Sequence, residues 1–231
     1  MRIALLSATA LTTSIAFMVP GAALAQATTD WTGFYASAGI GAGYSDGTVD
    51  ILNYTTDGAP ADEAYGSTEP GPMFGVGVGY NQQIGSFVLG IEADASLTDF
   101  KGSESSSSFD ESPNYFVQTR LDTLLTLRGR LGFATGNMLI YGTAGLAGGD
   151  ASFTSSIDLA DAAATGFTTG YVAGAGVEVA LNEKMSIKTE GLVYKLSPLS
   201  AVSDEGKNDN TYNAENRPGG VVVRSGVNFK F

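Results

Sequence analysis

The sequence predicts an all-β chain that closes into an eight-stranded antiparallel transmembrane up-and-down β-barrel. Two observations lead to this prediction. Eight segments alternate apolar and polar residues with a period of two, which is typical of strands with one apolar face. Their connections alternate between a few residues and roughly 15 to 25 residues, and short turns on one rim with long loops on the other are typical of membrane barrels.

Each of the eight segments is long enough for a tilted strand to cross the hydrocarbon layer of a membrane. The fifth segment is rich in glycine and apolar on both faces, so the pattern leaves its inward face open. The approximate ranges are 31–45, 72–82, 86–98, 115–134, 138–149, 166–181, 184–196 and 220–231.

Three stretches without charged residues could instead suggest transmembrane helices. The first two have turn residues inside them, including Gly85 and Gly136, so each is better explained as two strands around a turn. The chain has 31 glycines in 231 residues. This is about twice the usual share, and each glycine inside a helix costs about 1 kcal/mol relative to alanine. The three stretches are 71–91, 131–149 and 162–177.

The N-terminus predicts a secretory signal peptide over residues 1–25. Arg2 provides a short basic start, residues 3–19 carry no charge, and Ala23-Leu24-Ala25 has the small-x-small pattern of a cleavage site. Cleavage after Ala25 leaves one barrel domain, residues 26–231. A retained membrane anchor is the alternative.

The composition argues against several classes of function. The chain has no cysteine and no histidine, so it lacks the commonest general base and metal ligand. Its formal charge of −12 repels the phosphates of nucleic acids. We expect no enzymatic activity, no cofactor, no bound metal and no nucleic-acid partner. The acidic stretch 46–71 lacks the dense ligand alternation of a calcium loop and is interpreted as a solvated loop.

Charged residues on the polar faces predict a plugged barrel. Lipid offers no hydrogen bonds, so the apolar faces must meet lipid and the polar faces must point inward. The interior of an eight-stranded barrel is just wide enough for side chains to fill it. We expect the inward charges to pair in a network, with Lys230 on the same face. The predicted network comprises Glu92, Asp94, Arg120, Asp122, Arg128, Arg130, Glu178, Lys188, Glu190 and Arg224.

The four long connections are acidic. They hold 17 of the 24 acidic residues. Long connections of such barrels face outward, so we expect these acidic loops on the extracellular side. Their ranges are 46–71, 98–114, 150–165 and 197–217.

Several short motifs carry a family resemblance that spans the predicted mature chain. They are Trp31-Thr32-Gly33-Phe34-Tyr35, Gly90-Ile91-Glu92-Ala93-Asp94, Arg128-Gly129-Arg130-Leu131-Gly132, Tyr141-Gly142-Thr143-Ala144-Gly145, Gly174-Ala175-Gly176-Val177-Glu178 and the C-terminal stretch from Arg224 to Phe231. With these motifs the chain resembles the small outer-membrane surface-antigen or porin family, the OmpA-type eight-stranded barrels of Gram-negative bacteria. It departs from the family in having Gly191, not an aromatic residue, after Glu190.

The resemblance implies a location in the outer membrane of the cell, in contact with lipid and lipopolysaccharide. It also implies that Val227, Phe229 and Phe231 form the signal by which barrel-assembly machinery recognises its clients. Roles in such families include envelope integrity, surface antigenicity, adhesion and haem binding.

Three functions remain open at this point. A structural and surface-interaction protein of the cell envelope, expected to be a monomer, agrees best with a plugged interior. A narrow porin-like channel or small-ligand binder of the haem type is the alternative. An outer-membrane enzyme is the weakest, because histidine is missing. The sequence does not identify a partner for the loops.

Overall fold

The computed structural model describes most of the chain from Thr29 to the C-terminus. The predicted signal peptide, residues 1–25, lies outside the described residues, and so does its cleavage point. The described ranges are 29–45, 48–52, 55–56, 59–60, 64–65, 70–106, 115–157, 160–203 and 213–231.

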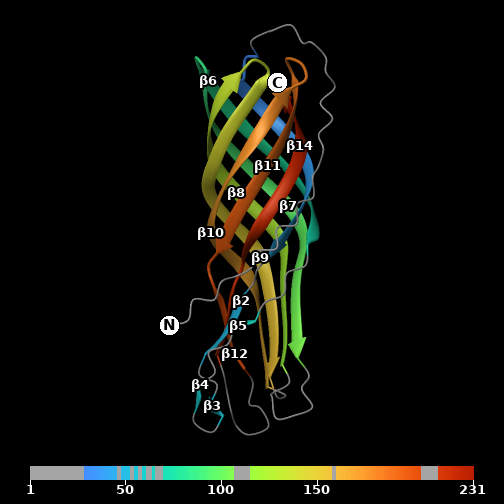
Figure 1. Ribbon diagram of the computed structural model, residues 1–231, viewed down its shortest axis with the longest axis vertical. Coiled ribbons are helices and arrows are strands. Elements are labelled where there is room, and N and C mark those ends of the chain that lie inside the picture. Colours follow the sequence, from blue (N-terminus) through green and yellow to red (C-terminus); the bar gives the residue numbers. More distant parts are fainter. Residues whose placement is uncertain are drawn as a thin grey trace.

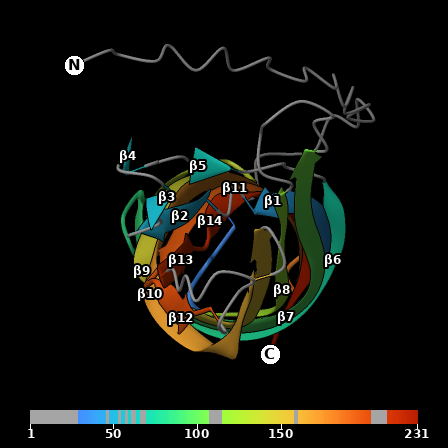
Figure 2. The same cartoon turned by 90° about the horizontal axis from the view of Figure 1, so that it is seen from below.

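Eight long strands form a closed barrel in the order β1-β14-β11-β10-β9-β8-β7-β6, and each pairs antiparallel with both neighbours. Figure 1 shows the barrel lengthwise and Figure 2 shows the ring end-on. The predicted fold class is confirmed. The strands are β1 (Gly33–Ser45), β6 (Gly71–Ile84), β7 (Phe87–Ser106), β8 (Tyr115–Thr135), β9 (Met138–Ile157), β10 (Ala160–Ala180), β11 (Met185–Leu196) and β14 (Gly219–Lys230).

The described residues contain no helix that is long and apolar enough to span a membrane. The three charge-free stretches lie in strands and their turns, as predicted. Two of these turns have glycine in the left-handed region, with φ of 62° at Gly85 and 60° at Gly136, a conformation that glycine adopts without a steric penalty. They lie at one end of the barrel, together with the C-terminus (Figure 1), and we call this the short-turn end.

The last strand closes the ring on the first. Ala36 pairs with Phe229, Ala38 pairs with Val227, and the backbone amide of Phe231 donates a hydrogen bond to the carbonyl oxygen of Phe34 at 3.2 Å. Closure leaves no open edge along the shared part of the sheet, which is the condition for a sheet surrounded by lipid.

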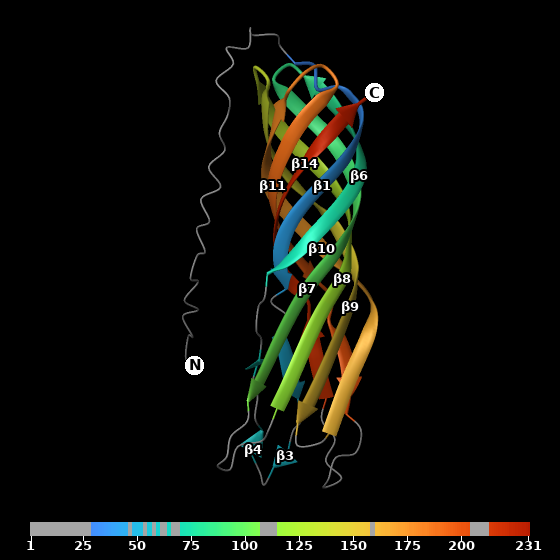
Figure 3. The same cartoon turned by 90° about the vertical axis from the view of Figure 1, so that its right-hand side faces the viewer.

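The opposite end, which we call the long-connection end, is more ordered than the loops we predicted there. Strands β7 to β10 continue well beyond the ends of β1 and β6 (Figure 3), so parts of the predicted loops 98–114 and 150–165 are strand. The other two predicted loops contribute a four-stranded sheet in the order β12-β13-β2-β5 and a two-stranded hairpin. Their strands are β2 (Thr48–Leu52), β3 (Thr55–Thr56), β4 (Ala59–Pro60), β5 (Ala64–Tyr65), β12 (Leu199–Val202) and β13 (Asn213–Arg217).

Burial alternates along the barrel strands as the period of two predicts. Phe34, Phe74 and Ile91 point outward with more than half of their surface exposed, while their strand neighbours are less exposed. The fifth predicted segment, now β9, turns its odd-numbered residues inward. The inward residues include Leu139, Tyr141, Thr143 and Ala147.

Two predicted interior residues, Arg120 and Asp122, lie on the outside, so this prediction was wrong. The pairing of β8 with β9 shifts by one residue between Leu121 and Leu125. Such a bulge exchanges the two faces of the strand. Leu121 is therefore buried, and the side chains of Arg120 and Asp122 are 48% and 45% exposed.

Candidate functional site

Eight charged side chains gather in the middle of the barrel. They are all of the buried charged residues in the described part of the chain, and each is at most 8% exposed. Four are carboxylates and four are cations, so their formal charges cancel. The eight are Glu92, Asp94, Arg128, Arg130, Glu178, Lys188, Glu190 and Arg224.

Arg128 lies at the centre of this charge network. Its Nη2 contacts Glu92, which is on the neighbouring strand, and Asp94 Oδ2 at 2.9 Å. Its Nη1 crosses the interior to Glu190 Oε2 at 3.1 Å, and its Nε donates to Thr126 Oγ1 at 2.9 Å. One guanidinium thus joins carboxylates on β7 and β11, and charge-assisted hydrogen bonds of this kind are the strong ones.

Two further cations complete the pairing of these carboxylates. Arg224 donates from Nε to Glu190 Oε1 at 2.6 Å and from Nη1 to Asp94 Oδ1 at 2.8 Å. Lys188 Nζ contacts both carboxylate oxygens of Glu92, at 2.8 and 2.9 Å. Each carboxylate therefore has at least two cationic partners, which compensates for taking it out of water.

Arg130 connects the network to the short-turn end. Its Nη2 pairs with Glu178 Oε2 at 2.7 Å, and its Nη1 donates to the Tyr35 hydroxyl at 3.2 Å. Its Cζ lies 3.8 Å from the centre of the Tyr141 ring, a cation–π contact. The two tyrosine hydroxyls in turn donate to carboxylates, Tyr35 to Glu92 Oε2 at 2.6 Å and Tyr141 to Glu190 Oε2 at 3.1 Å.

Glycines make room for these two tyrosines. Gly79 pairs with Tyr35 across β6 and β1, and Gly176 pairs with Tyr141 across β10 and β9. A Cβ at Gly79 would lie 2.4 Å from the Tyr35 ring, and a Cβ at Gly176 would lie 2.5 Å from the Tyr141 ring. Each ring therefore covers the backbone of a neighbouring strand that has no side chain there.

Apolar side chains fill the barrel on both sides of the charge network. Toward the long-connection end lies a large apolar layer drawn from seven strands. Toward the short-turn end, Trp31, Val88, Leu139 and Ala180 form a smaller cluster around Tyr141. The larger layer comprises Met73, Phe100, Leu121, Leu124, Ala147, Ala151, Val172, Leu192, Tyr194, Leu196 and Val222.

The remaining predicted interior residues take no part in the network. Arg120 pairs with Asp122 outside the barrel and lies 3.7 Å from Asp99. A hydrogen bond from Lys101 holds the pKa of the Asp99 carboxyl below its usual range. Lys230 donates to the backbone oxygen of Asp30 at 2.6 Å on the short-turn rim.

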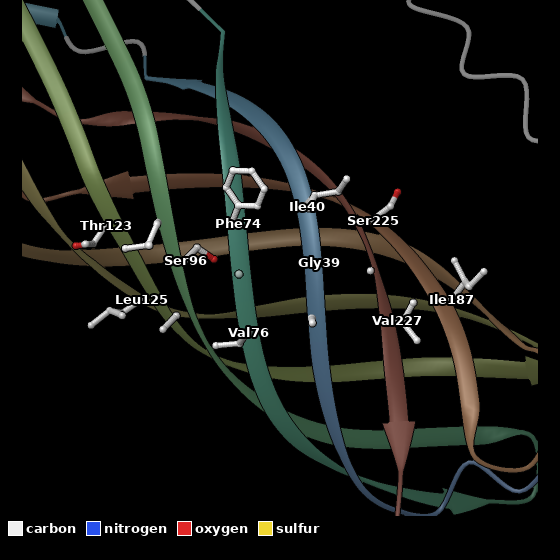
Figure 4. Close-up of a pocket in the computed structure, with 15 residues that line it drawn as sticks. Gly39, Ile40, Phe74, Val76, Ser96, Thr123, Leu125, Ile187, Ser225 and Val227 are labelled. Carbon is white, nitrogen blue, oxygen red and sulfur yellow. The ribbon is translucent and has the colours of Figure 1, made fainter.

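The outer face of the barrel carries a large apolar groove. A groove of about 830 Å³ lies on the outer face, where Phe74, Val76 and Ile40 project from adjacent strands (Figure 4). Two small cavities that border the charge network measure about 30 and 20 Å³. Neither could pass a solute of appreciable size.

The three predicted assembly residues lie where the alternation placed them, on the outer face at the short-turn end. Val227, Phe229 and Phe231 are 41%, 48% and 74% exposed. They line up along the end of the chain without contacting the charge network.

Tyr35 and Tyr141 are functional members of the interior that the sequence analysis did not single out. The role of Tyr35 as a bridge between Arg130 and Glu92 was not predicted. The signal that could have found both is the pairing of a tyrosine with glycine on the next strand, together with an inward arginine at the same level.

Comparisons with known proteins agree with this geometry. Residues 11–224 match the family described as outer membrane protein beta-barrel domain. The 31 kDa outer-membrane immunogenic protein of Brucella melitensis is 34% identical over 218 residues, covering 88% of this chain and 85% of the relative. The 22 kDa outer membrane protein of Rhizobium leguminosarum is 36% identical over 112 residues, which cover 48% of this chain and 46% of the relative.

Two solved structures share the fold. The outer membrane protein OprG of Pseudomonas aeruginosa superposes with a TM-score of 0.59 at 13% identity, covering 88% of this chain and 98% of OprG. The outer membrane protease OmpT of Escherichia coli gives a TM-score of 0.52 at 9% identity, and the match covers 90% of this chain and 100% of OmpT. At these identities the likeness concerns the fold alone.

Proposed function

This chain belongs to the outer membrane protein beta-barrel domain family, and on that premise we propose that it is a closed barrel that conducts no ions and catalyses no reaction. It acts through the strands that extend from the long-connection end. The outer membrane is its location. The observation that carries the proposal is the layer of four carboxylates and four cations that fills the interior between two apolar layers.

Two physical barriers oppose ion flow. The guanidinium groups of Arg128 and Arg224 join carboxylates of different strands, so an ion must break several short contacts to pass. The large apolar layer beyond them holds no charge, and apolar constrictions close pores by excluding water. An ion would have to overcome both barriers in series.

The proposed interaction surface is the extension of β7 to β10 together with the four-stranded sheet beside it. Long connections of such barrels face outward, which puts this β-structure on the cell surface. Gln118, Thr154, Asp161 and Thr165 point outward on it and are exposed. A polar surface built on strands presents a defined shape to a partner.

Lipid and assembly contacts complete the proposal. The outward apolar side chains meet membrane lipid, and lipopolysaccharide is the lipid expected around the extracellular half. The exposed aromatic side chains of Phe229 and Phe231, at the end of the chain, are available to the barrel-assembly machinery before the barrel closes. The protein carries out these roles as a monomer.

Single-channel recording in planar bilayers tests the proposal. We expect no steady conductance from the unmodified protein. The Arg128→Ala variant should give small, brief currents because it unpairs carboxylates in the interior, while Arg120→Ala, which alters the outer face of the same strand, should remain silent. A steady conductance like that of large porins from the unmodified protein would replace this proposal with the channel function.

A further inference from the structure

Four buried polar atoms at the short-turn side of the charge network have no hydrogen-bond partner among the described residues. They are Trp31 Nε1, Asn81 Oδ1, Asn228 Oδ1 and Arg130 Nε. Their side chains belong to residues that are at most 5% exposed. Buried polar groups in proteins nearly always have a partner, and ordered water supplies it where protein does not.

Three of these four residues line the same cavity. Trp31, Asn81 and Asn228 surround a volume of about 30 Å³, together with Glu178 and Ser186. One water molecule needs roughly 10 to 15 Å³ of such space and two to four polar partners. The cavity therefore has the size and the lining for one or two water molecules.

Gly90 lets Asn81, which lines the cavity, approach Arg130 of the network. A Cβ at Gly90 would lie 2.3 Å from Asn81 Oδ1 and 2.9 Å from Arg130 Cγ, so the missing side chain leaves these two groups beside each other. The unpaired Asn81 oxygen is an acceptor, and the unpaired Arg130 Nε is a donor.

We propose that this cavity is a water site that opens to the periplasm, and that Trp31 is the lid through which water reaches the charge network from the short-turn end. The inference rests on the proposed function, since it assumes a barrel closed toward the cell exterior. Water there supplies the missing hydrogen bonds of Trp31, Asn81 and Asn228.

The lid is held by a small number of contacts at the rim. The backbone amide of Trp31 donates to Gln83 Oε1 at 2.9 Å, and the backbone amide of Gln83 donates to Thr32 Oγ1 at 3.2 Å. Its indole packs in the small apolar cluster with Val88, Leu139 and Ala180. The eleven buried residues of the opposite apolar layer form a much larger seal. Local opening is therefore easier at the short-turn end.

Engineered cysteines test this asymmetry, because the chain has no cysteine of its own. Ser186→Cys reports on the cavity, and Ser96→Cys reports on the far side of the network; both serines point inward and are at most 7% exposed. The purified barrel, in lipid nanodiscs, is reacted with a small water-soluble methanethiosulfonate. Circular dichroism checks that each variant keeps its β-structure.

We expect Ser186→Cys to react slowly in the otherwise unmodified barrel and roughly ten to a hundred times faster when Trp31→Ala removes the lid, since loss of a buried aromatic strongly favours opening. Trp31→Phe keeps the apolar packing and should leave the rate low. Ser96→Cys should not accelerate with Trp31→Ala. Equal rates at Ser186→Cys with and without the lid would overturn the proposal.

A second measurement uses the same lid. Trp31 is the only tryptophan of the chain, so quenching of its fluorescence by iodide reports its exposure directly. Gln83→Ala, which removes the oxygen that accepts from the Trp31 amide, should increase quenching at least about twofold by favouring local opening. Unchanged quenching would contradict the assignment of Trp31 as a lid. Labelling of Ser96→Cys together with steady conductance would instead overturn the closed-barrel function.

Discussion

Arg128 on β8 and Glu190 on β11 pair at 3.1 Å although they are not on neighbouring strands: β9 and β10 separate them on the shorter path around the ring, and four strands separate them on the longer path. The contact therefore crosses the barrel interior and joins two walls that the sheet hydrogen bonds do not join directly. A side chain that reaches across the lumen in this way both closes it and couples the positions of the two walls.

Arg128→Ala should lower the free energy of unfolding by about 3 to 5 kcal/mol, because it leaves Glu92, Asp94 and Glu190 short of a buried partner. Urea titration of the barrel in lipid vesicles measures this. The matched control is Arg120→Ala on the same strand, whose side chain is 48% exposed, and which should change stability by less than about 1 kcal/mol. Equal effects of both variants would show that the interior pairs do not stabilise the barrel.

Replacing Glu92 and Arg128 together, by glutamine and methionine, should be milder than either single replacement. The double variant removes one negative and one positive charge, so the six remaining charges of the network still cancel. Each single variant leaves one unbalanced charge in the interior. A double-mutant cycle on the unfolding free energies measures the coupling, and strictly additive losses would contradict the prediction.

The period of two was sufficient to predict the eight barrel strands and the inward position of eight of the ten charges of the network. It failed at Arg120 and Asp122 because one inserted residue in β8 exchanges inside and outside beyond it. The adjacent leucines Leu124 and Leu125 mark this break, since strict alternation would not place two large apolar residues side by side. One is buried and the other is 42% exposed.

The extended strands at the long-connection end were predicted as loops for a different reason. Outside the lipid both faces of a strand can be polar, so the sequence there lacks the continuous apolar face by which a membrane strand is identified. In β9, Phe153 is buried but Thr154 and Ser152 flank it and Ser155 is also buried. The contacts across the lumen could not be predicted either, because alternation fixes the face of a residue and not its level in the barrel.

Gly79→Ala should destabilise the barrel by about 1 to 3 kcal/mol, because its Cβ would lie 2.4 Å from the Tyr35 ring and force it to move. Displacing Tyr35 also disturbs its hydrogen bond with Glu92. Gly191→Ala is the control, since nothing lies within 4 Å of its Cβ position; it should be neutral or raise stability by up to about 1 kcal/mol. Equal losses would show that tyrosine packing over glycine is not the cause.

The proposed membrane orientation predicts which engineered cysteines react in intact cells. Asp161→Cys, exposed at the long-connection end, should be labelled by a membrane-impermeant maleimide, because long connections face outward. Glu183→Cys, exposed in a short turn, should react only after the outer membrane is permeabilised. Labelling of Glu183→Cys alone in intact cells would reverse the orientation.

Deleting Phe231 should impair insertion in cells much more than it weakens the folded barrel. Its side chain is 74% exposed, so its removal eliminates little packing, and the hydrogen bond from its amide to Phe34 is one of many that close the ring. The refolded truncated protein should lose less than about 2 kcal/mol of stability. Its level in the outer membrane should nevertheless fall severely, because we propose that the barrel-assembly machinery recognises the terminal aromatic residue. Phe74→Ala is the control: this phenyl group is 61% exposed on the same outer face but lies far from the C-terminus, and its removal should leave the cellular level near normal. If the truncated protein reaches the membrane as well as Phe74→Ala does, recognition does not depend on Phe231.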